Sequence, residues 1–141
     1  MSTRRIIEDA YKAYQEGRTL DAFANCAEDF KFNWAAQAGQ TRWSAGGADL
    51  QGMFEKFSAL AETYDYLAYE VLKLIADGDE AAAEVRVSLR HKKTGVEFDM
   101  NIADFWTVKD GQIASLTEYF DTALILSIDG EEKLAAASAA P

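Results

Sequence analysis

The chain has 141 residues, of which 24 are acidic and 14 are basic, and its formal net charge is −10. This length suits a single domain whose core can enclose a cavity without help from a disulfide or a metal ion. The acidic balance, with no run of Lys or Arg longer than a pair, argues against binding to nucleic acids or other polyanions.

The cysteine content and the lack of a long apolar stretch bear on where the protein resides. Cys26 has no second cysteine for an internal disulfide, which suits a reducing compartment. No stretch reaches membrane-spanning length, and charged residues follow the early Arg4-Arg5 pair where a targeting signal would need an apolar core. We therefore expect a soluble cytoplasmic protein that does not bind membranes.

Two helices are predicted first. Ile7, Tyr11 and Tyr14 are spaced i, i+4, i+7, so they share one face of a helix that ends at Gly17. A second helix is predicted from about residue 19, and the segment that contains Cys26 is assigned to it. Each helix is expected to bury one apolar face.

One strand and a third helix follow. Phe30, Phe32 and Trp34 alternate with polar residues, a pattern typical of a half-buried strand. A glycine-rich loop over residues 39–47 is expected to form a flexible rim. Apolar residues then repeat at helical spacing over residues 50–61, which predicts the longest helix of the chain.

The second half of the chain predicts four strands in an antiparallel meander. Turn signals at residues 77–79, 93–95 and 110–111 separate four extended runs, and Asp-Gly dipeptides between alternating segments mark hairpins. A short helix is expected after the last strand. We therefore predict an α+β fold in one domain over residues 1–128, followed by a mobile acidic and alanine-rich tail over residues 129–141.

Asp104 interrupts an otherwise apolar strand face. From Phe98 to Val108 the even positions are apolar except for Asp104, whereas several odd positions are polar. Because alternate residues of a strand share a face, this carboxyl is predicted to point into the apolar interior. A lone buried charge is costly unless it is paired or protonated, so Asp104 is either paired structurally or chemically useful.

The order of elements and one motif resemble a known superfamily. The similarity is carried by residues 27–30, by residues 46–57, and above all by the segments DFWTVKDGQI (104–113) and EYFD (118–121). Over about residues 5–125 the chain resembles the SnoaL-like, ketosteroid-isomerase-like branch of the nuclear transport factor 2 superfamily. The resemblance implies an NTF2-like cone, in which three helices pack on a curved, mostly antiparallel sheet that encloses a pocket. It also implies a homodimer.

Ketosteroid isomerases, one branch of this superfamily, match the chain at only one of three catalytic positions. They need an Asp base, a Tyr donor and a second Asp held protonated in an apolar site. The resemblance aligns Asp104 with the protonated Asp. It places Trp34 or Asn33 at the base and Ala10 at the tyrosine, so steroid isomerisation is not expected.

Two other branches offer different chemistry. The resemblance to limonene-1,2-epoxide hydrolases aligns Asp121 with one of their two acids, but their Arg-x-Asp appears here as Arg86-Val87-Ser88. Polyketide cyclases of the SnoaL type fit better, because their aldol chemistry is attributed largely to one acid/base carboxyl. Asp104 takes the place of that carboxyl.

Asp104 is therefore the candidate general acid/base, and Tyr14 and Asp121 are further candidates for the site. Removing a proton next to a carbonyl needs a base whose pKa lies nearer neutrality than that of a free Asp, and burial raises a carboxyl pKa in that direction. The expected ligand is a flat, apolar small molecule. The predicted pocket walls are Phe32, Trp34, Met100 and Trp106.

Each candidate also has a purely structural explanation. Asp104 would accept a hydrogen bond from a helix-one tyrosine such as Tyr14, Asp121 would cap the short helix, and the wall aromatics would simply pack. His91 is expected to be solvated beside its turn, and one histidine without metal-ligand spacing predicts neither a metal site nor a cofactor. Three functions stay open: a cofactor-independent isomerase, cyclase or hydrolase, a non-catalytic binding module for an apolar metabolite, and an interaction domain that uses its outer sheet face.

Overall fold

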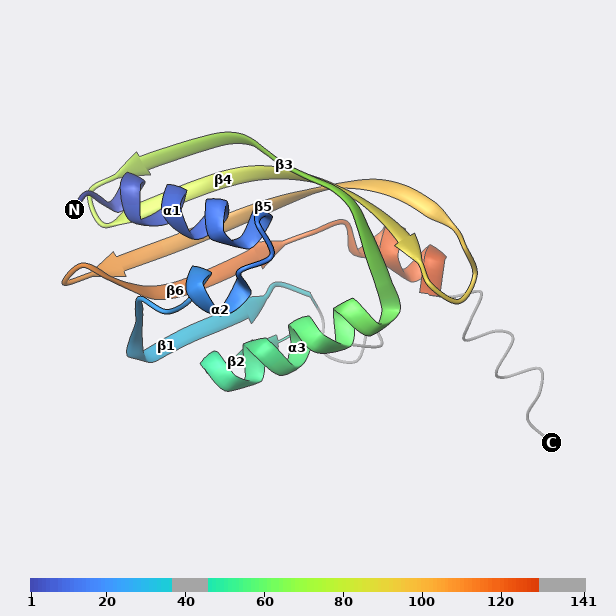
Figure 1. Ribbon diagram of the computed structural model, residues 1–141, viewed down its shortest axis with the longest axis horizontal. Coiled ribbons are helices and arrows are strands. Elements are labelled where there is room, and N and C mark those ends of the chain that lie inside the picture. The colour runs from blue at the N-terminus through green and yellow to red at the C-terminus, as the bar shows by residue number, and fades with distance from the viewer. Residues whose placement is uncertain (37–45, 130–141) are drawn as a thin grey trace.

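The predicted helices and strands form in the expected order and build a curved sheet with helices against one side (Figure 1). The computed structural model describes residues 1–36 and 46–129. In chain order the elements are α1 (Thr3–Gln15), α2 (Thr19–Ala22), β1 (Cys26–Trp34), β2 (Gly46–Ala48), α3 (Leu50–Thr63), β3 (Tyr64–Asp77), β4 (Glu80–His91), β5 (Glu97–Lys109) and β6 (Gln112–Tyr119).

The six strands hydrogen-bond in the order β2-β1-β6-β5-β4-β3. Neighbouring strands are antiparallel except for β1 and β6, which are parallel. The sheet stays open, and its inner face carries the hydrophobic core against the helices. The prediction of an α+β fold with a mostly antiparallel curved sheet is confirmed.

α1 forms as predicted, whereas α2 is shorter than expected. The Ser2 side chain caps α1 by accepting a hydrogen bond from the Arg5 backbone N–H at 3.2 Å, and Gly17 follows the helix with a φ of 77°. α2 has only four residues, and Cys26, which the sequence analysis assigned to a helix, begins β1 instead. Cys26 lies opposite Ile113 of β6, and this strand pairing overrides the weak helix preference of the segment.

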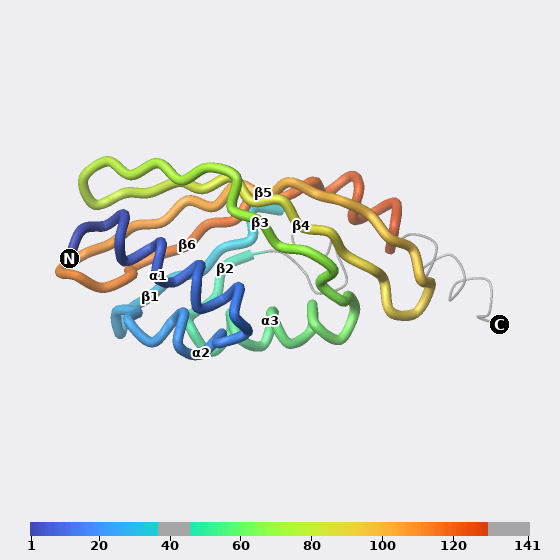
Figure 2. The backbone as a smooth tube through the Cα atoms, turned by 45° about the horizontal axis from the view of Figure 1, so that its top comes forward, coloured from blue at the N-terminus to red at the C-terminus, as the bar shows by residue number. Residues whose placement is uncertain are grey.

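α3 and the following four strands match the prediction. The Asp49 side chain caps α3 by accepting a hydrogen bond from the Gly52 backbone N–H at 2.8 Å, and the helix is the longest of those described. The strands β3 to β6 run back and forth as long hairpins (Figure 2). Gly78, Gly95 and Gly111 turn the chain between them with positive φ angles.

A helix over residues 122–129 follows β6 and packs at one end of the sheet (Figure 1). Its Ile125 is fully buried in the core. Asp129, which was predicted to belong to the tail, is the last described residue of this helix and is also buried. The rest of the predicted tail, residues 130–141, and residues 39–45 of the predicted glycine-rich loop lie outside the described part of the chain. Gly46 and Gly47, which the prediction placed in that loop, belong instead to β2, because this segment pairs with β1.

Candidate functional site

An apolar pocket lies between the helices and the inner face of the sheet. Its cavity volume is about 50 Å³. Small-molecule sites span roughly 300–1,000 Å³, so the cavity is much smaller than such a site, because its own side chains narrow it. The lining residues are Ala10, Tyr11, Tyr14, Phe23, Trp34, Phe57, Leu60, Tyr66, Tyr69, Val87, Leu89, Met100, Ile102, Asp104, Trp106, Leu116, Glu118, Phe120 and Ile125.

Asp104 forms part of the pocket wall and is 1% exposed. The alternation that predicted its direction holds along β5: Met100 and Trp106 are buried on the same inner face, while Asp99 and Phe105 are exposed on the outer face. The prediction that this carboxyl points into an apolar interior is therefore confirmed.

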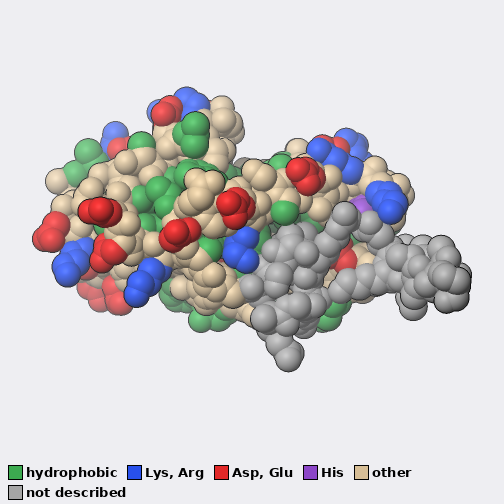
Figure 3. Space-filling model, turned by 90° about the horizontal axis from the view of Figure 1, so that it is seen from below, with side chains coloured by type: hydrophobic (Ala, Val, Ile, Leu, Met, Phe, Trp, Pro, Cys, Tyr) green, Lys and Arg blue, Asp and Glu red, His purple; other side chains and the backbone are tan. Residues whose placement is uncertain are grey.

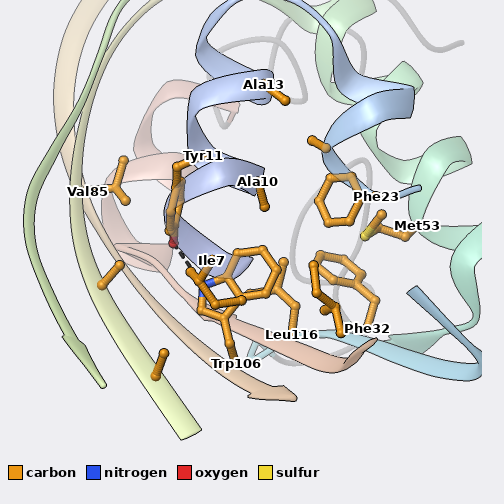
Figure 4. Close-up of a cluster of buried hydrophobic side chains, with 14 of the residues drawn as sticks. Ile7, Ala10, Tyr11, Ala13, Phe23, Phe32, Met53, Val85, Trp106 and Leu116 are labelled. Carbon is orange, nitrogen blue, oxygen red and sulfur yellow. Dashed lines mark hydrogen bonds between the residues drawn. The ribbon is translucent and has the colours of Figure 1, made fainter. Parts of the chain in front are cut away.

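A tyrosine of α1 binds the Asp104 carboxyl, but it is Tyr11 and not Tyr14. The Tyr11 hydroxyl donates to Asp104 Oδ2 at 2.5 Å. It also accepts a hydrogen bond from Trp106 Nε1 at 3.0 Å, which is drawn as a dashed line in Figure 4. The Tyr14 hydroxyl lies 3.3 Å from the Tyr66 hydroxyl of β3. Tyr11 directly follows Ala10, the position that the resemblance assigned to the tyrosine of ketosteroid isomerases, so the acid does carry a tyrosine donor.

Glu118 is a second acid of the site, which the sequence analysis did not nominate. It lies opposite Asp104 in the register between β5 and β6 and also lines the pocket. The indole Nε1 of Trp34, on β1, donates to Glu118 Oε2 at 2.6 Å. Two carboxyls on neighbouring strands thus face the same pocket, each bound by an aromatic donor from a different element.

A β-bulge explains why Glu118 was missed. The partners Val108 and Ile113 lie next to the β5–β6 turn, but beyond them Thr107 pairs with Ser115, so β6 carries one extra residue. A one-residue shift moves all following side chains to the opposite face. Without the bulge, Glu118 would point outward.

The pKa values of the two carboxyls follow from burial and from their proximity. Burial raises the pKa of Asp104 well above its usual range, the charge of Glu118 raises it further, and the hydrogen bond from Tyr11 opposes the rise. Burial also raises the pKa of Glu118, while the hydrogen bonds from Trp34 and Asp104 lower it. Burial raises the pKa of Tyr14 to about 12, so this hydroxyl stays protonated at neutral pH.

The other predicted site residues divide into two groups. Trp34, Met100 and Trp106 line the pocket as expected. Phe32 is 1% exposed and packs edge-to-face on Trp34 without lining the pocket. Asp121 is exposed and caps the final helix, since its Oδ1 accepts a hydrogen bond from the backbone N–H of the residue three positions later at 3.0 Å.

His91 is buried, so the prediction that it is solvated is wrong. It is 1% exposed, and its ring packs edge-to-face on Tyr64 with the centroids 5.2 Å apart. Its Nδ1 accepts hydrogen bonds from the backbone N–H groups of Lys93 and Thr94. The imidazole therefore stabilises the turn from the inside, which nearness to a turn in the sequence does not reveal.

The charge around the pocket differs from that of the outer surface. Figure 3 shows acidic and basic side chains interspersed over the face seen from below. The described residues that line the pocket include two carboxyls but no Lys, Arg or His. This lining favours a neutral or cationic ligand over an anionic one.

Neither a membrane span nor a grouped metal site is found in the described parts of the chain. None of the helices within residues 1–36 and 46–129 combines the length and the apolar character needed to cross a bilayer. In the same two segments, no three His, Cys, Asp or Glu side chains come together in a way that would hold a metal ion.

The sequence matches the family model of SnoaL-like domains over residues 7–116. The chain belongs to the SnoaL-like domain family. The matched region includes Tyr11, Trp34 and Asp104 and ends before Glu118. No curated protein matches the chain.

Solved structures share the fold of this SnoaL-like protein. An NTF2-like protein of Burkholderia thailandensis superposes with a TM-score of 0.78 at 22% identity, covering 90% of this chain and 96% of that one. A protein of Mesorhizobium loti described as a SnoaL-like polyketide cyclase gives 0.71 at 20% identity, with coverages of 84% and 99%. TerC, co-crystallised with polyporic acid, gives 0.73 at 15% identity, with coverages of 89% and 97%. At these identities the likeness shows the NTF2-like fold alone.

Proposed function

We propose that this SnoaL-like protein binds an apolar small molecule in its pocket and acts on it by cofactor-independent acid/base catalysis. The observation that carries the proposal is the Asp104 carboxyl, buried in the wall of an aromatic pocket with the Tyr11 hydroxyl bound to it. Burial raises the pKa of this carboxyl from its usual acidic range in the direction of neutral pH, and a general acid or base works best when its pKa lies near the operating pH.

The lining supports a flat ligand with a carbonyl or hydroxyl oxygen. Aromatic rings from α1, β1, α3, β3 and β5 line the pocket and offer faces on which such a ligand stacks, including those of Tyr14, Trp34 and Phe57. Proton abstraction next to a carbonyl, as in cyclisation or isomerisation, is the reaction that a carboxyl in this setting supports. Two solved proteins of similar fold support this choice, since one is described as a polyketide cyclase and the other was crystallised with polyporic acid.

Steroid isomerisation is less well supported. Asp104 and Tyr11 provide an acid and a tyrosine, two of the three groups that a ketosteroid isomerase uses. Trp34 or Asn33 occupies the expected place of the base, and neither an indole nor an amide abstracts a proton. A polyketide-cyclase-like reaction is therefore favoured.

Native mass spectrometry of freshly purified protein tests the binding part of this proposal. We expect a small molecule that stays bound to the wild type and is lost in Trp34→Ala, which removes one wall. Phe105→Ala is the matched control, because Phe105 is an exposed aromatic residue on the outer face of β5. Binding that survives in Trp34→Ala, or protein that is always empty, would contradict the proposal.

We also propose that the outer sheet face forms a homodimer interface. Phe105 and Tyr119 are each 51% exposed on this face, with their ring centroids 5.7 Å apart, and Ile75 is 57% exposed nearby. Clustered exposed apolar residues mark interaction surfaces. In sedimentation velocity, Phe105→Glu is expected to give monomers, while Leu20→Glu, at a 74% exposed apolar position on α2, is expected to keep the dimer. A wild-type monomer would refute the proposal.

A further inference from the structure

We propose that Glu118 is a second catalytic residue of the pocket: Glu118 carries the negative charge and acts as the base, whereas Asp104 carries the proton and acts as the acid. This inference deepens the proposed function and rests on it for the catalytic step. The placement of the proton, however, is a property of the free protein.

The positions of the Asp104 and Glu118 carboxyls indicate that the two groups share one proton. Asp104 and Glu118 face each other across β5 and β6, and two adjacent buried carboxyls cannot both be ionised cheaply. Asp104 Oδ2 already accepts a hydrogen bond from the Tyr11 hydroxyl, and among the described residues no hydrogen-bond donor contacts its buried Oδ1. A proton on Oδ1 would satisfy this atom and would bind the Glu118 carboxylate.

The donors around the pair place the charge on Glu118. Trp34 Nε1–H donates to Glu118 Oε2 at 2.6 Å and stabilises a carboxylate, and Glu118 is partly exposed toward the pocket. Asp104 is only 1% exposed, so a negative charge on its carboxyl is costly. Trp34 is thus a positioning residue that acts through Glu118.

Few other polar groups face the pair. Among the described lining residues, α1 contributes Tyr11 and Tyr14, β3 contributes Tyr66 and Tyr69, and β4 contributes only apolar side chains. The ammonium group of Lys56, on α3, lies 5.6 Å from the centre of the Trp34 ring. The lining thus supplies hydroxyl donors and no cation to neutralise the pair, which favours retention of one proton.

With Glu118 as the base and Asp104 as the acid, the pair can convert a carbonyl compound into its enol. The Glu118 carboxylate takes a proton from the carbon next to the carbonyl, and the electron pair of the broken C–H bond forms the new C=C bond. The C=O π bond breaks at the same time, and its electrons form an O–H bond to the proton that Asp104 gives up. The products are an enol, protonated Glu118 and ionised Asp104, so the total charge of the site stays at one negative. The enol is the nucleophile that a cyclisation or an isomerisation requires.

Carbon-13 NMR titration of the assigned side-chain carboxyls in the wild-type protein, without any ligand, tests the proton placement. We expect Glu118 to ionise at lower pH than Asp104. If Asp104 ionises first, the assignment of roles is overturned. Because this measurement needs no ligand, it is independent of whether the proposed binding function holds.

Two variants sharpen the test. Glu118→Gln should lower the pKa of Asp104, because a neighbouring negative charge is removed, and Trp34→Phe should raise the pKa of Glu118, because the indole N–H is lost. Glu84→Gln, on the outer face of β4, is the control and should shift neither carboxyl. An unchanged Asp104 titration in Glu118→Gln, in protein whose amide spectrum shows it folded, would overturn the shared proton.

Discussion

Two buried hydrogen bonds between a tyrosine and an aspartate lie in different regions of this molecule. In the pocket, the Tyr11 hydroxyl donates to Asp104 at 2.5 Å, and at the end of the C-terminal helix the Tyr64 hydroxyl donates to Asp129 at 2.6 Å. Both aspartates are 1% exposed, and in both the second carboxyl oxygen is buried with no hydrogen-bond donor from residues 1–36 or 46–129. As isolated pairs they are almost identical.

Their surroundings differ. Asp104 faces the carboxyl of Glu118 and lines a pocket, whereas Asp129 is not a lining residue of that pocket. The Tyr64 ring packs edge-to-face on His91 and Phe98, so its hydrogen bond joins the final helix to the sheet. A buried tyrosine–aspartate pair is therefore not by itself a mark of a functional site; a second acid and an adjoining cavity are what distinguish the first pair.

The largest difference between the two aspartates should appear in catalysis. Asp104→Asn is expected to lower kcat for the compound identified by mass spectrometry by about 10²–10⁴-fold, the usual contribution of a general acid or base. Asp129→Asn should leave kcat unchanged. Steady-state kinetics on both variants measures this, and equal losses would show that Asp104 has no special role.

The second pair should matter for stability. Tyr64→Phe leaves the buried Asp129 carboxyl without its donor, so we expect the free energy of unfolding to fall by about 1–3 kcal/mol. Urea denaturation gives this value. Tyr119→Phe removes a tyrosine hydroxyl at a 51% exposed position and should have almost no effect. A loss in Tyr119→Phe as large as in Tyr64→Phe would refute the explanation.

The smallest expected effect is on the pH dependence of stability. The folded-state pKa values of Asp104 and Glu118 are raised, so the folded protein binds more protons than the unfolded chain above about pH 4. The stability that these groups contribute is thus fully present below that pH and is lost as the pH rises through their folded pKa values. Urea denaturation across pH should show this loss in the wild type and a weaker one in Asp104→Asn.

Asp99, on the same strand as Asp104, is a control whose pKa shift and effect on the pH dependence of stability have the opposite sign. Hydrogen bonds from Ser88 and Arg86 lower the pKa of its exposed carboxyl, so its contribution is present above about pH 4 and is lost as the pH falls through its folded pKa. Asp99→Asn should therefore change the acidic side of the stability profile. If Asp104→Asn changed the dependence of stability on pH in the same way as Asp99→Asn, the upward direction of the Asp104 pKa shift would be contradicted.

Much of the fold was predictable because its signals are local. The alternation along β5, the spacing of the apolar residues in α3 and the three turns each act over a few residues. The errors fell where distant segments meet. Cys26 became a strand residue because β1 pairs with β6, and His91 is buried because the Tyr64 ring lies against it.

The sequence by itself determined that Asp104 points inward, since strand alternation and an apolar face leave a carboxyl no other direction. Only the tertiary structure decided which groups meet it. Tyr11 and Tyr14 share a helix face, and the docking of α1 on the sheet selects Tyr11. A single extra residue in β6 turns Glu118 inward. Helix docking and strand register depend on packing across the whole domain. Local sequence patterns therefore determine the helices and strands around the pocket, whereas tertiary packing determines which polar groups meet inside it.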